Sequence, residues 1–307
     1  MTVRPLDILD FPLIARYRND ALTLNSTRAL TRGNPLGTVA LMAYVNPARN
    51  MYSAVANGDN AELVGGVIHA RGDTFARLLY LAPASRLDHA ALPELVENLV
   101  ARAGSWGALH VTAEVDENSD AFVALRQVGF SVYAWQRMWN VSEIDGDKHT
   151  KSGWKRSHSV NVPGIQSLHH QIVPPLVQPV EPISNKIRGF ICKVDAGCFV
   201  SIVTGVYGIV ILPLIHPEAT DVVEKFKALM PILPERRNRP VYMMVRSYQT
   251  WLEPVLEDLG ASPGERQAVM VKHMARRIKE EQPASAVPSR ASVQPSQVSR
   301  MEVENKK

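Results

Sequence analysis

Three carboxylates stand where a strand-like run meets a helical pattern in the first half of the chain. Glu114 lies near the end of the run at 108–115, and Asp116 and Glu117 precede the helical pattern at 119–128. A carboxylate at the end of a strand can accept a proton from a nucleophile within hydrogen-bond reach, which makes Glu114 the candidate general base. The alternative is that Glu114 faces solvent, while Asp116 and Glu117 stabilise the positive N-terminal end of the helix.

The spacing of histidine and cysteine predicts no metal site. None of the nine histidines begins a His-Glu-x-x-His pattern, and Cys192 and Cys198 do not form a Cys-x-x-Cys pair. These are two of the frames in which a chain presents zinc ligands. The cysteines flank a turn signal at 195–197 and would not face each other in a hairpin. We therefore expect free thiols.

Length and composition are those of a globular protein with about two domains. The 307 residues are 46% hydrophobic and 21% charged, enough to bury a core in each half. The longest apolar run, at 199–215, is interrupted by polar residues, glycine and proline, so it predicts buried strands and no membrane span. A net charge of +4 with scattered basic residues does not favour a nucleic-acid partner. The N-terminus has no signal-peptide pattern and cysteines are few, which favours a cytoplasmic protein.

A strand–helix–strand unit occurs twice. Residues 108–141 contain a helix that ends at Gly129, and residues 240–274 repeat the pattern with a helix that ends at Gly260. Because a recurring unit indicates repeated architecture, we predict two similar domains joined head to tail. The predicted divisions are a first domain at 1–141, a linker and the start of the second domain at 142–182, a second domain at 183–279, and a disordered tail at 280–307.

The remaining patterns predict an α+β fold, in which each domain is a mixed, mostly antiparallel twisted sheet flanked by helices. Turn signals that suit antiparallel hairpins separate strand candidates at 38–44, 51–56, 63–70 and 76–81. A helix at 90–103 holds Pro93 in its first turn and ends at Gly104. The pair Gly65-Gly66 predicts a bulge within its strand. In the second half we predict strands and a helix at 189–194, 198–203, 206–212 and 218–229.

The order of elements across residues 1–141 resembles the GNAT superfamily, the acyl-CoA-dependent N-acyltransferases. The family commonly shows an asparagine, an alanine three residues later and a Gly-Phe pair after the helix. Asn118, Ala121, Gly129 and Phe130 stand at those spacings. The second half resembles the same fold less clearly and is identified as a degenerate copy. The resemblance thus implies a tandem arrangement in which the second copy is non-catalytic.

The resemblance also implies acetyl-CoA, or another acyl-CoA, as co-substrate. In the family, two parallel strands diverge and offer backbone groups to the pantetheine arm, and the pyrophosphate lies on the N-terminus of the next helix. The diverging strands would here be 76–81 and 109–115. The phosphate loop corresponds to 86–91, with His89 in place of the family's glycine. The implied cofactor-binding residues are Leu81, Ala82, Arg86, His89, Ala90, Ala91 and Asn118.

The activity implied by the resemblance is N-acyl transfer to a primary amine of a small molecule or peptide. The amine would attack the thioester directly, with Glu114 as base and the amides near Leu81 and Ala82 polarising the carbonyl. The family's tyrosine acid is replaced by Leu125, and by Leu256 in the second half. Tyr80 and Tyr133 are both candidate substitutes, and the spacing does not decide between them.

The alternative is a catalytically inactive tandem protein that binds a ligand or a protein partner. The loop at 85–91 separates the two hypotheses. Amides that are open and point inward would favour the enzyme, whereas a loop blocked by Asp88 or His89 would favour the binding module.

Overall fold

The computed structural model describes residues 2–37, 50–57, 62–146, 153–183, 188–192, 197–234 and 238–274. Residues Met1–Ala275 form one compact unit. The strand expected at 38–44 and the disordered tail expected from 280 lie outside the described residues.

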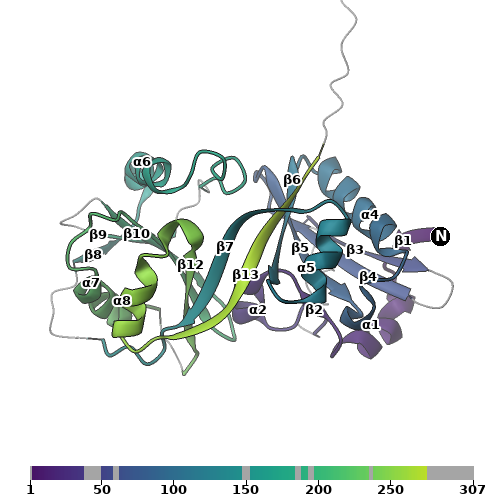
Figure 1. Cartoon of the computed structure of the whole chain (residues 1–307), viewed down its shortest axis with the longest axis horizontal. Helices are drawn as coiled ribbons and strands as arrows, with labels where there is room; N and C mark the ends of the chain where they lie inside the picture. Colours follow the sequence, from purple (N-terminus) through teal and green to yellow (C-terminus); the bar gives the residue numbers. More distant parts are fainter. Residues whose placement is uncertain are drawn as a thin grey trace, which may run out of the picture. The chain divides into compact units, whose positions relative to one another are not determined.

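The first half follows the predicted order of elements (Figure 1). Its strands are β1 (Thr2–Pro5), β2 (Leu22–Thr23), β3 (Asn50–Asn57), β4 (Glu62–His69), β5 (Phe75–Ala82), β6 (His110–Asp116) and β7 (Ser131–Asn140). Its helices are α1 (Phe11–Tyr17), α2 (Ser26–Arg32), α4 (Leu92–Ser105) and α5 (Asp120–Gln127). The predicted helix at 90–103 is confirmed with a shift of two residues, and proline stands in its first turn.

The second half also combines strands with helices. Its strands are β8 (Trp154–Arg156), β9 (Gly189–Cys192), β10 (Cys198–Thr204), β11 (Ile209–Ile215), β12 (Val241–Arg246) and β13 (Ser262–His273). Its helices are α6 (Val162–Ile172), α7 (Val222–Leu229) and α8 (Leu252–Asp258). The helix predicted from Glu218 begins later because Asp221, which precedes its first turn, adopts a left-handed φ of 52°. Cys192 and Cys198 are buried thiols that form no disulfide with each other.

One sheet runs through both halves. Its strand order is β1-β3-β4-β5-β6-β13-β7-β12-β11-β10-β9-β8, and β2 pairs with β5 outside this path. All pairings among the described strands are antiparallel except β5 with β6 and β11 with β12. The predicted α+β class, with a mixed and mostly antiparallel sheet flanked by helices, is confirmed.

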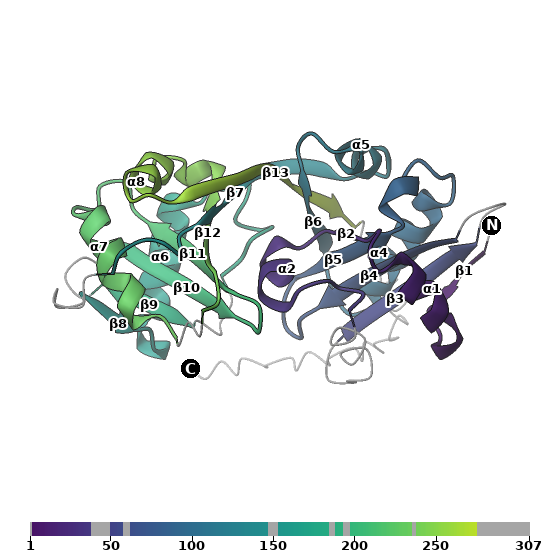
Figure 2. The same cartoon turned by 90° about the horizontal axis from the view of Figure 1, so that it is seen from below.

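Two long strands belong to both halves. β13, the last strand of the second repeat, lies between β6 and β7 and pairs with both. The later part of β7, in turn, pairs with β12 of the second repeat. Figure 2 shows β7 and β13 side by side along their path from one half to the other. The sheet continues across the predicted boundary at residue 141. The domain limits given above stay predictions.

Each half contains one parallel strand pair that diverges. β5 and β6 are paired over residues 75–77 and 110–112 and then separate. β11 and β12 are paired over residues 209–211 and 241–243 and then separate. Past these positions the facing backbone groups need partners other than the neighbouring strand.

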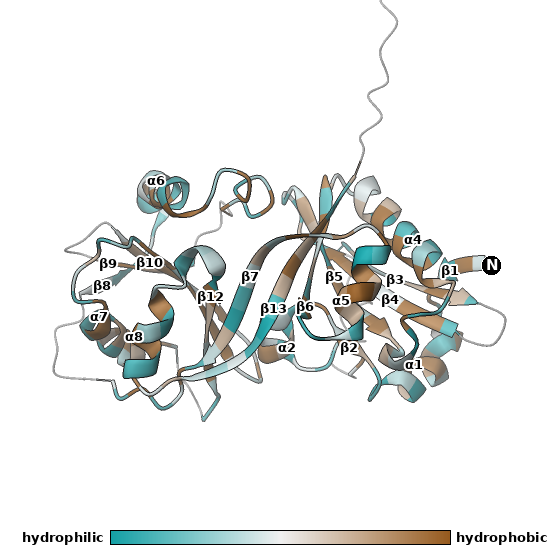
Figure 3. Cartoon of the chain, viewed as in Figure 1, coloured by the Kyte–Doolittle hydropathy of each residue, from teal (hydrophilic) through white to brown (hydrophobic). Residues whose placement is uncertain are grey.

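The helices α4 and α5 cover one face of the first half of the sheet. Apolar residues of α4 alternate with polar ones along the helix (Figure 3), and its buried positions join a core that includes Ala76 and Leu78 of β5 and Val111 and Ala113 of β6. Since side chains alternate along a strand, the residues between these positions point to the opposite face. That face carries Glu114 and borders a cavity.

Candidate functional site

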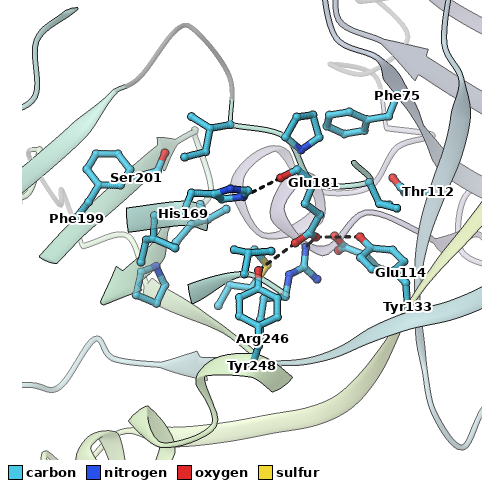
Figure 4. Close-up of a pocket in the computed structure, with 18 of the residues that line it drawn as sticks. Phe75, Thr112, Glu114, Tyr133, His169, Glu181, Phe199, Ser201, Arg246 and Tyr248 are labelled. Carbon is cyan, nitrogen blue, oxygen red and sulfur yellow. Dashed lines mark hydrogen bonds and ion pairs between the residues drawn. The ribbon is translucent and has the colours of Figure 1, made fainter. Parts of the chain in front are cut away.

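A cavity of about 260 Å³ lies where the face of β5, β6 and β7 opposite α4 and α5 meets β10, β11, β12 and the segment that follows α6 (Figure 4). Its polar lining residues are Arg77, Thr112, Glu114, Tyr133, His169, Glu181, Ser201, Arg246 and Tyr248. Its apolar lining is made of Phe75, Val173, Val180, Pro182, Ile183, Phe199, Leu212, Pro213, Leu214 and Met244. A concave, mostly apolar site with a few convergent polar groups is typical of small-molecule binding.

Two buried histidines hold the segment at 173–183 over the cavity. His169 donates from Nε2 to the carbonyl of Glu181 at 3.0 Å, and His110 donates from Nε2 to the carbonyl of Val180 at 3.2 Å. Burial lowers the pKa of both imidazoles, so both are neutral donors at pH 7. They fix the backbone that carries Glu181.

Glu181 is the centre of a closed polar network. Tyr133 and Tyr248 donate their hydroxyl groups to its two carboxylate oxygens at 2.8 and 3.1 Å, and the guanidinium of Arg246 pairs with the same carboxylate. Arg246 also donates to Gln136. Burial, followed by the charge of Glu181, raises the pKa of Tyr133 and of Tyr248 well above the usual range. The tyrosines therefore remain protonated donors at any physiological pH.

Glu114, the residue predicted to act as base, lies on β6 and lines the cavity beside Tyr133 (Figure 4). Its Oε2 accepts the backbone N–H of Ser26 at 2.7 Å. Arg77 lies on the neighbouring strand, stacked over the ring of Phe75 at 4.3 Å. Burial lowers the pKa of Arg77 while the carboxylates of Asp73 and Glu114 oppose that shift, and a guanidinium stays charged in proteins.

The gap between β5 and β6 is filled by the chain itself. β2 pairs with the separated part of β5, Leu22 opposite Leu81 and Thr23 opposite Tyr80. Leu24 continues this pairing, because its N–H donates to the carbonyl of Leu79 at 2.9 Å and its carbonyl accepts the N–H of Glu114 at 3.0 Å. The segment at 22–24 thus spans the gap and bonds to both strands.

The loop predicted to hold pyrophosphate also has hydrogen-bond partners from within the chain. Asp20 accepts the N–H of Ala84 at 2.8 Å with its carbonyl, and accepts the N–H and hydroxyl of Ser85 at 3.2 and 2.6 Å with its carboxylate. His89 accepts the N–H of Ala91 at 3.1 Å through Nδ1 and the N–H of Leu92 at 3.0 Å through its carbonyl. The N–H groups of Ala91 and Leu92 at the start of α4 thus already have His89 as their acceptor, and the carboxylate of Asp20 lies against Ser85.

The residues predicted to bind the cofactor divide into two groups. Residues 81–91 lie together along the end of β5 and the loop before α4, with Ala91 fully buried. Asn118 lies exposed in the turn between β6 and α5, and no hydrogen bond among the described residues joins it to that loop. These assignments to a cofactor stay predictions.

The gap between β11 and β12 is closed by a side chain. The amide of Gln249 accepts the N–H of Ile215 at 3.0 Å and donates to the carbonyl of Pro213 at 2.9 Å. Gln249 is 1% exposed. The amide thus takes the place of a neighbouring strand along β11.

The leucines at the position of the family's acid, Leu125 and Leu256, are fully buried core residues. Of the two candidate substitutes, Tyr80 is buried away from the cavity and its hydroxyl bonds to that of Ser53 at 2.8 Å. Tyr133 lines the cavity. Sequence reasoning missed Glu181, Arg246 and Gln249; the only available signal was a charged or amide residue at the end of an apolar strand, as in Arg246 and Gln249.

Among the described residues, no group of three or more histidine, cysteine, aspartate or glutamate side chains is placed to hold a metal ion. None of the helices in the described part of the chain has the length and apolar character needed to cross a membrane.

Solved structures of proteins named as acetyltransferases share this fold. A GCN5-related N-acetyltransferase of Sphaerobacter thermophilus is 11% identical over 90% of this chain and 96% of its own, with a TM-score of 0.53. A tandem GNAT protein from the clavulanic acid biosynthesis pathway is 13% identical over 90% of this chain and 99% of its own, with a TM-score of 0.52. No family model matches the sequence, and no curated protein matches it.

The chain, a mostly antiparallel sheet in which one parallel strand pair of each half diverges, has an acetyltransferase-like fold. More particularly, the chain has the fold of a tandem GCN5-related N-acetyltransferase, as the repeat and the resemblance of residues 1–141 had indicated. At 9 to 13% identity the likeness establishes fold, and function has to be argued from the site.

Proposed function

We propose that this chain is a small-molecule-binding protein built on a tandem acetyltransferase fold, with its ligand in the cavity beside Glu181 and Arg246. One observation carries the proposal. The segment at 22–24 forms the hydrogen bonds along β5 that an acyl-CoA arm would otherwise form.

Competition within the chain is the physical reason. A bound pantetheine arm would have to displace Leu24 from Leu79 and Glu114, and the N–H and carbonyl of Leu24 would each cost about 1–3 kcal/mol if left buried without a partner. The displaced segment stays tethered beside the gap, so it competes at a high local concentration. At the loop, the carboxylate of Asp20 lies against Ser85 and repels a pyrophosphate.

The second candidate function is acyl-CoA-dependent N-acyl transfer to an amine. It is favoured by Glu114, which lines the cavity at the edge of the diverging strands and could take a proton from the attacking amine. In this reaction the amine nitrogen would bond to the thioester carbon, and the sulfur would leave as a thiolate that takes up a proton. It requires residues 20–26 to leave the gap before acetyl-CoA enters.

Calorimetric titration with acetyl-CoA distinguishes the two functions. We expect no binding by the natural chain. We expect the double variant Asp20→Ala/His89→Gly to remain folded and to gain at most weak binding, because Leu24 still fills the gap. Asp258→Ala, an exposed position on α8, is the matched control. Binding by the natural chain in the micromolar range would overturn the proposal and favour the acyltransferase.

A further inference from the structure

Two charged groups of the cavity, the carboxylate of Glu181 and the guanidinium of Arg246, already pair with each other. The carboxylate of Glu181 accepts from two tyrosines and pairs with Arg246, and Arg246 also bonds to Gln136. A ligand that used this pair would have to break a buried network. The network therefore shapes the cavity wall, and recognition of a ligand falls to the other charged residues.

Arg77 has unused donor capacity. A guanidinium carries five N–H donors, yet that of Arg77 makes no hydrogen bond among the described residues. Its only ion pair in that part of the chain is a distant one to Asp73, 3.9 Å away. Its side chain lines the cavity and is 38% exposed. A planar guanidinium with free donors binds a carboxylate in two parallel hydrogen bonds.

Glu114 has unused acceptor capacity. Its Oε2 accepts the N–H of Ser26, while its Oε1 has no partner among the described residues. A carboxylate that is half-buried and singly bonded attracts a cationic donor such as an ammonium group.

The sheet places the charges of Arg77 and Glu114 in the same cavity but not in contact with each other. Arg77 is paired with Thr112, which is two residues before Glu114 on the same face of β6. Arg77 and Glu114 form no ion pair within 4.0 Å, although the charge of Glu114 acts on Arg77. Opposite charges that share a cavity without contact can be bridged by a ligand that carries both complementary charges.

The remaining wall is apolar. Val173, Phe199 and Leu214 belong to one hydrophobic cluster of the second half and line the cavity across from the first half. The volume of about 260 Å³ lies just below the range of about 300–1,000 Å³ typical of pockets for drug-sized ligands. The space suits a small molecule with one apolar group.

We infer that the cavity binds an α-amino-acid-like zwitterion with an apolar side chain. Its carboxylate would lie on Arg77, its ammonium on Glu114, and its side chain against Val173, Phe199 and Leu214. The inference rests on the proposed binding function and names the chemical class of the ligand.

The test is calorimetric titration with L-phenylalanine and L-leucine, together with two analogues that each lack one charge. 3-Phenylpropionate lacks the ammonium and 2-phenylethylamine lacks the carboxylate. We expect one of the amino acids to bind at least tenfold more tightly than either analogue, because a site built for two charged groups rejects a ligand that leaves one group unpaired.

Two variants test which charged group of the ligand Arg77 and Glu114 each bind. Arg77→Met is expected to abolish the preference for L-phenylalanine over phenylethylamine, and Glu114→Gln the preference over phenylpropionate. Arg71→Met, at an exposed position in the turn before β5, is expected to change neither preference. Circular dichroism confirms that each variant is folded.

Three results would overturn the inference. Equal binding of L-phenylalanine and phenylpropionate, or unchanged preferences in both variants, would exclude a zwitterion while leaving small-molecule binding in the cavity intact. Absence of binding by both amino acids would exclude this ligand class. The acetyl-CoA titration judges the proposed function separately, since only binding of acetyl-CoA by the natural chain contradicts it.

Discussion

The N–H of Leu24 donates a 2.9 Å hydrogen bond to the carbonyl of Leu79 at a point where β5 has already separated from β6. The carbonyl of Leu24 accepts from Glu114 on the other strand. A single residue therefore joins the two strands across the gap in which the family resemblance places the acyl-CoA arm. Its side chain is 1% exposed and belongs to the core of the first half.

Truncation of this side chain is expected to destabilise the fold. Leu24→Ala should lower the free energy of unfolding by about 2–5 kcal/mol, because it removes a fully buried leucine and leaves a cavity. Urea denaturation measures the change. Val123→Ala, on the exposed side of α5, should change it by less than about 0.5 kcal/mol. Equal effects would mean that Leu24 is not part of the packed core.

Removal of the amide that closes the second gap is expected to be costly. Gln249→Leu leaves the N–H of Ile215 and the carbonyl of Pro213 buried without a partner. At about 1–3 kcal/mol for each group, the free energy of unfolding should fall by roughly 2–6 kcal/mol. Gln171→Leu, at an exposed position of α6, is the control. A loss below about 1 kcal/mol would show that water or a rearranged strand replaces the amide.

Substitutions within the network around Glu181 are expected to lower the free energy of unfolding by different amounts. Glu181→Gln leaves the guanidinium of Arg246 buried without its counter-charge, and breaking a buried ion pair costs about 3–5 kcal/mol. Tyr248→Phe removes one hydrogen bond to a charged group and should cost about 1.5–3 kcal/mol. Chemical denaturation of both variants measures this order, and the reverse order would contradict the central position of Glu181.

Stability is expected to decline below neutral pH through His110 and His169. Burial lowers the pKa of both from the usual 6.5, so the unfolded chain binds protons that the folded chain does not. The stability is complete above the unfolded pKa of 6.5 and decreases as the pH falls toward the lower folded pKa. The neighbouring imidazoles of His273 and His170 face the same sites and add to this effect.

The variant His169→Gln isolates that contribution. Glutamine can still donate to the carbonyl of Glu181 but does not titrate, so the loss of unfolding free energy between pH 7.5 and 5.5 should become smaller. Urea denaturation at the two pH values gives the comparison. An unchanged pH dependence would show that His169 does not titrate differently in the two states.

Local signals in the sequence predicted most elements. The start of α4 follows from Pro93, which is tolerated only in the first turn of a helix. The predicted bulge at Gly65-Gly66 is confirmed by the register shift between Gly66 and Val67. Periodicity and turn residues act within a few positions of the chain, which is why such features can be predicted from one sequence.

The pairing of the strands was harder to predict from the sequence. The repeated unit at 240–274 predicted a strand after its helix, but nothing in it indicates that β13 begins at Ser262 and lies between β6 and β7. β2 contains only two residues, too few for any periodic pattern. Both features decide what fills the first gap and how the halves are joined, and both depend on tertiary contacts.

The site was predicted in part. Glu114 was singled out, and it lines the cavity; its role as a base stays a prediction. Glu181 was missed because it lies in the segment at 142–182 that was predicted to be a linker and the start of the second domain. Its partner Arg246 is 65 residues away in the sequence, so their pairing is a consequence of the fold.

Hydrogen exchange at the amide of Leu24 tests the central claim most directly. If residues 22–24 fill the gap between β5 and β6, this amide is protected in the free protein and its exchange rate is unchanged when acetyl-CoA is added in excess. The amide of Val123, on the exposed side of α5, serves as reference for nonspecific effects. Fast exchange of the Leu24 amide in the free protein, or loss of its protection on addition of acetyl-CoA, would contradict the account and show that the gap opens to a cofactor.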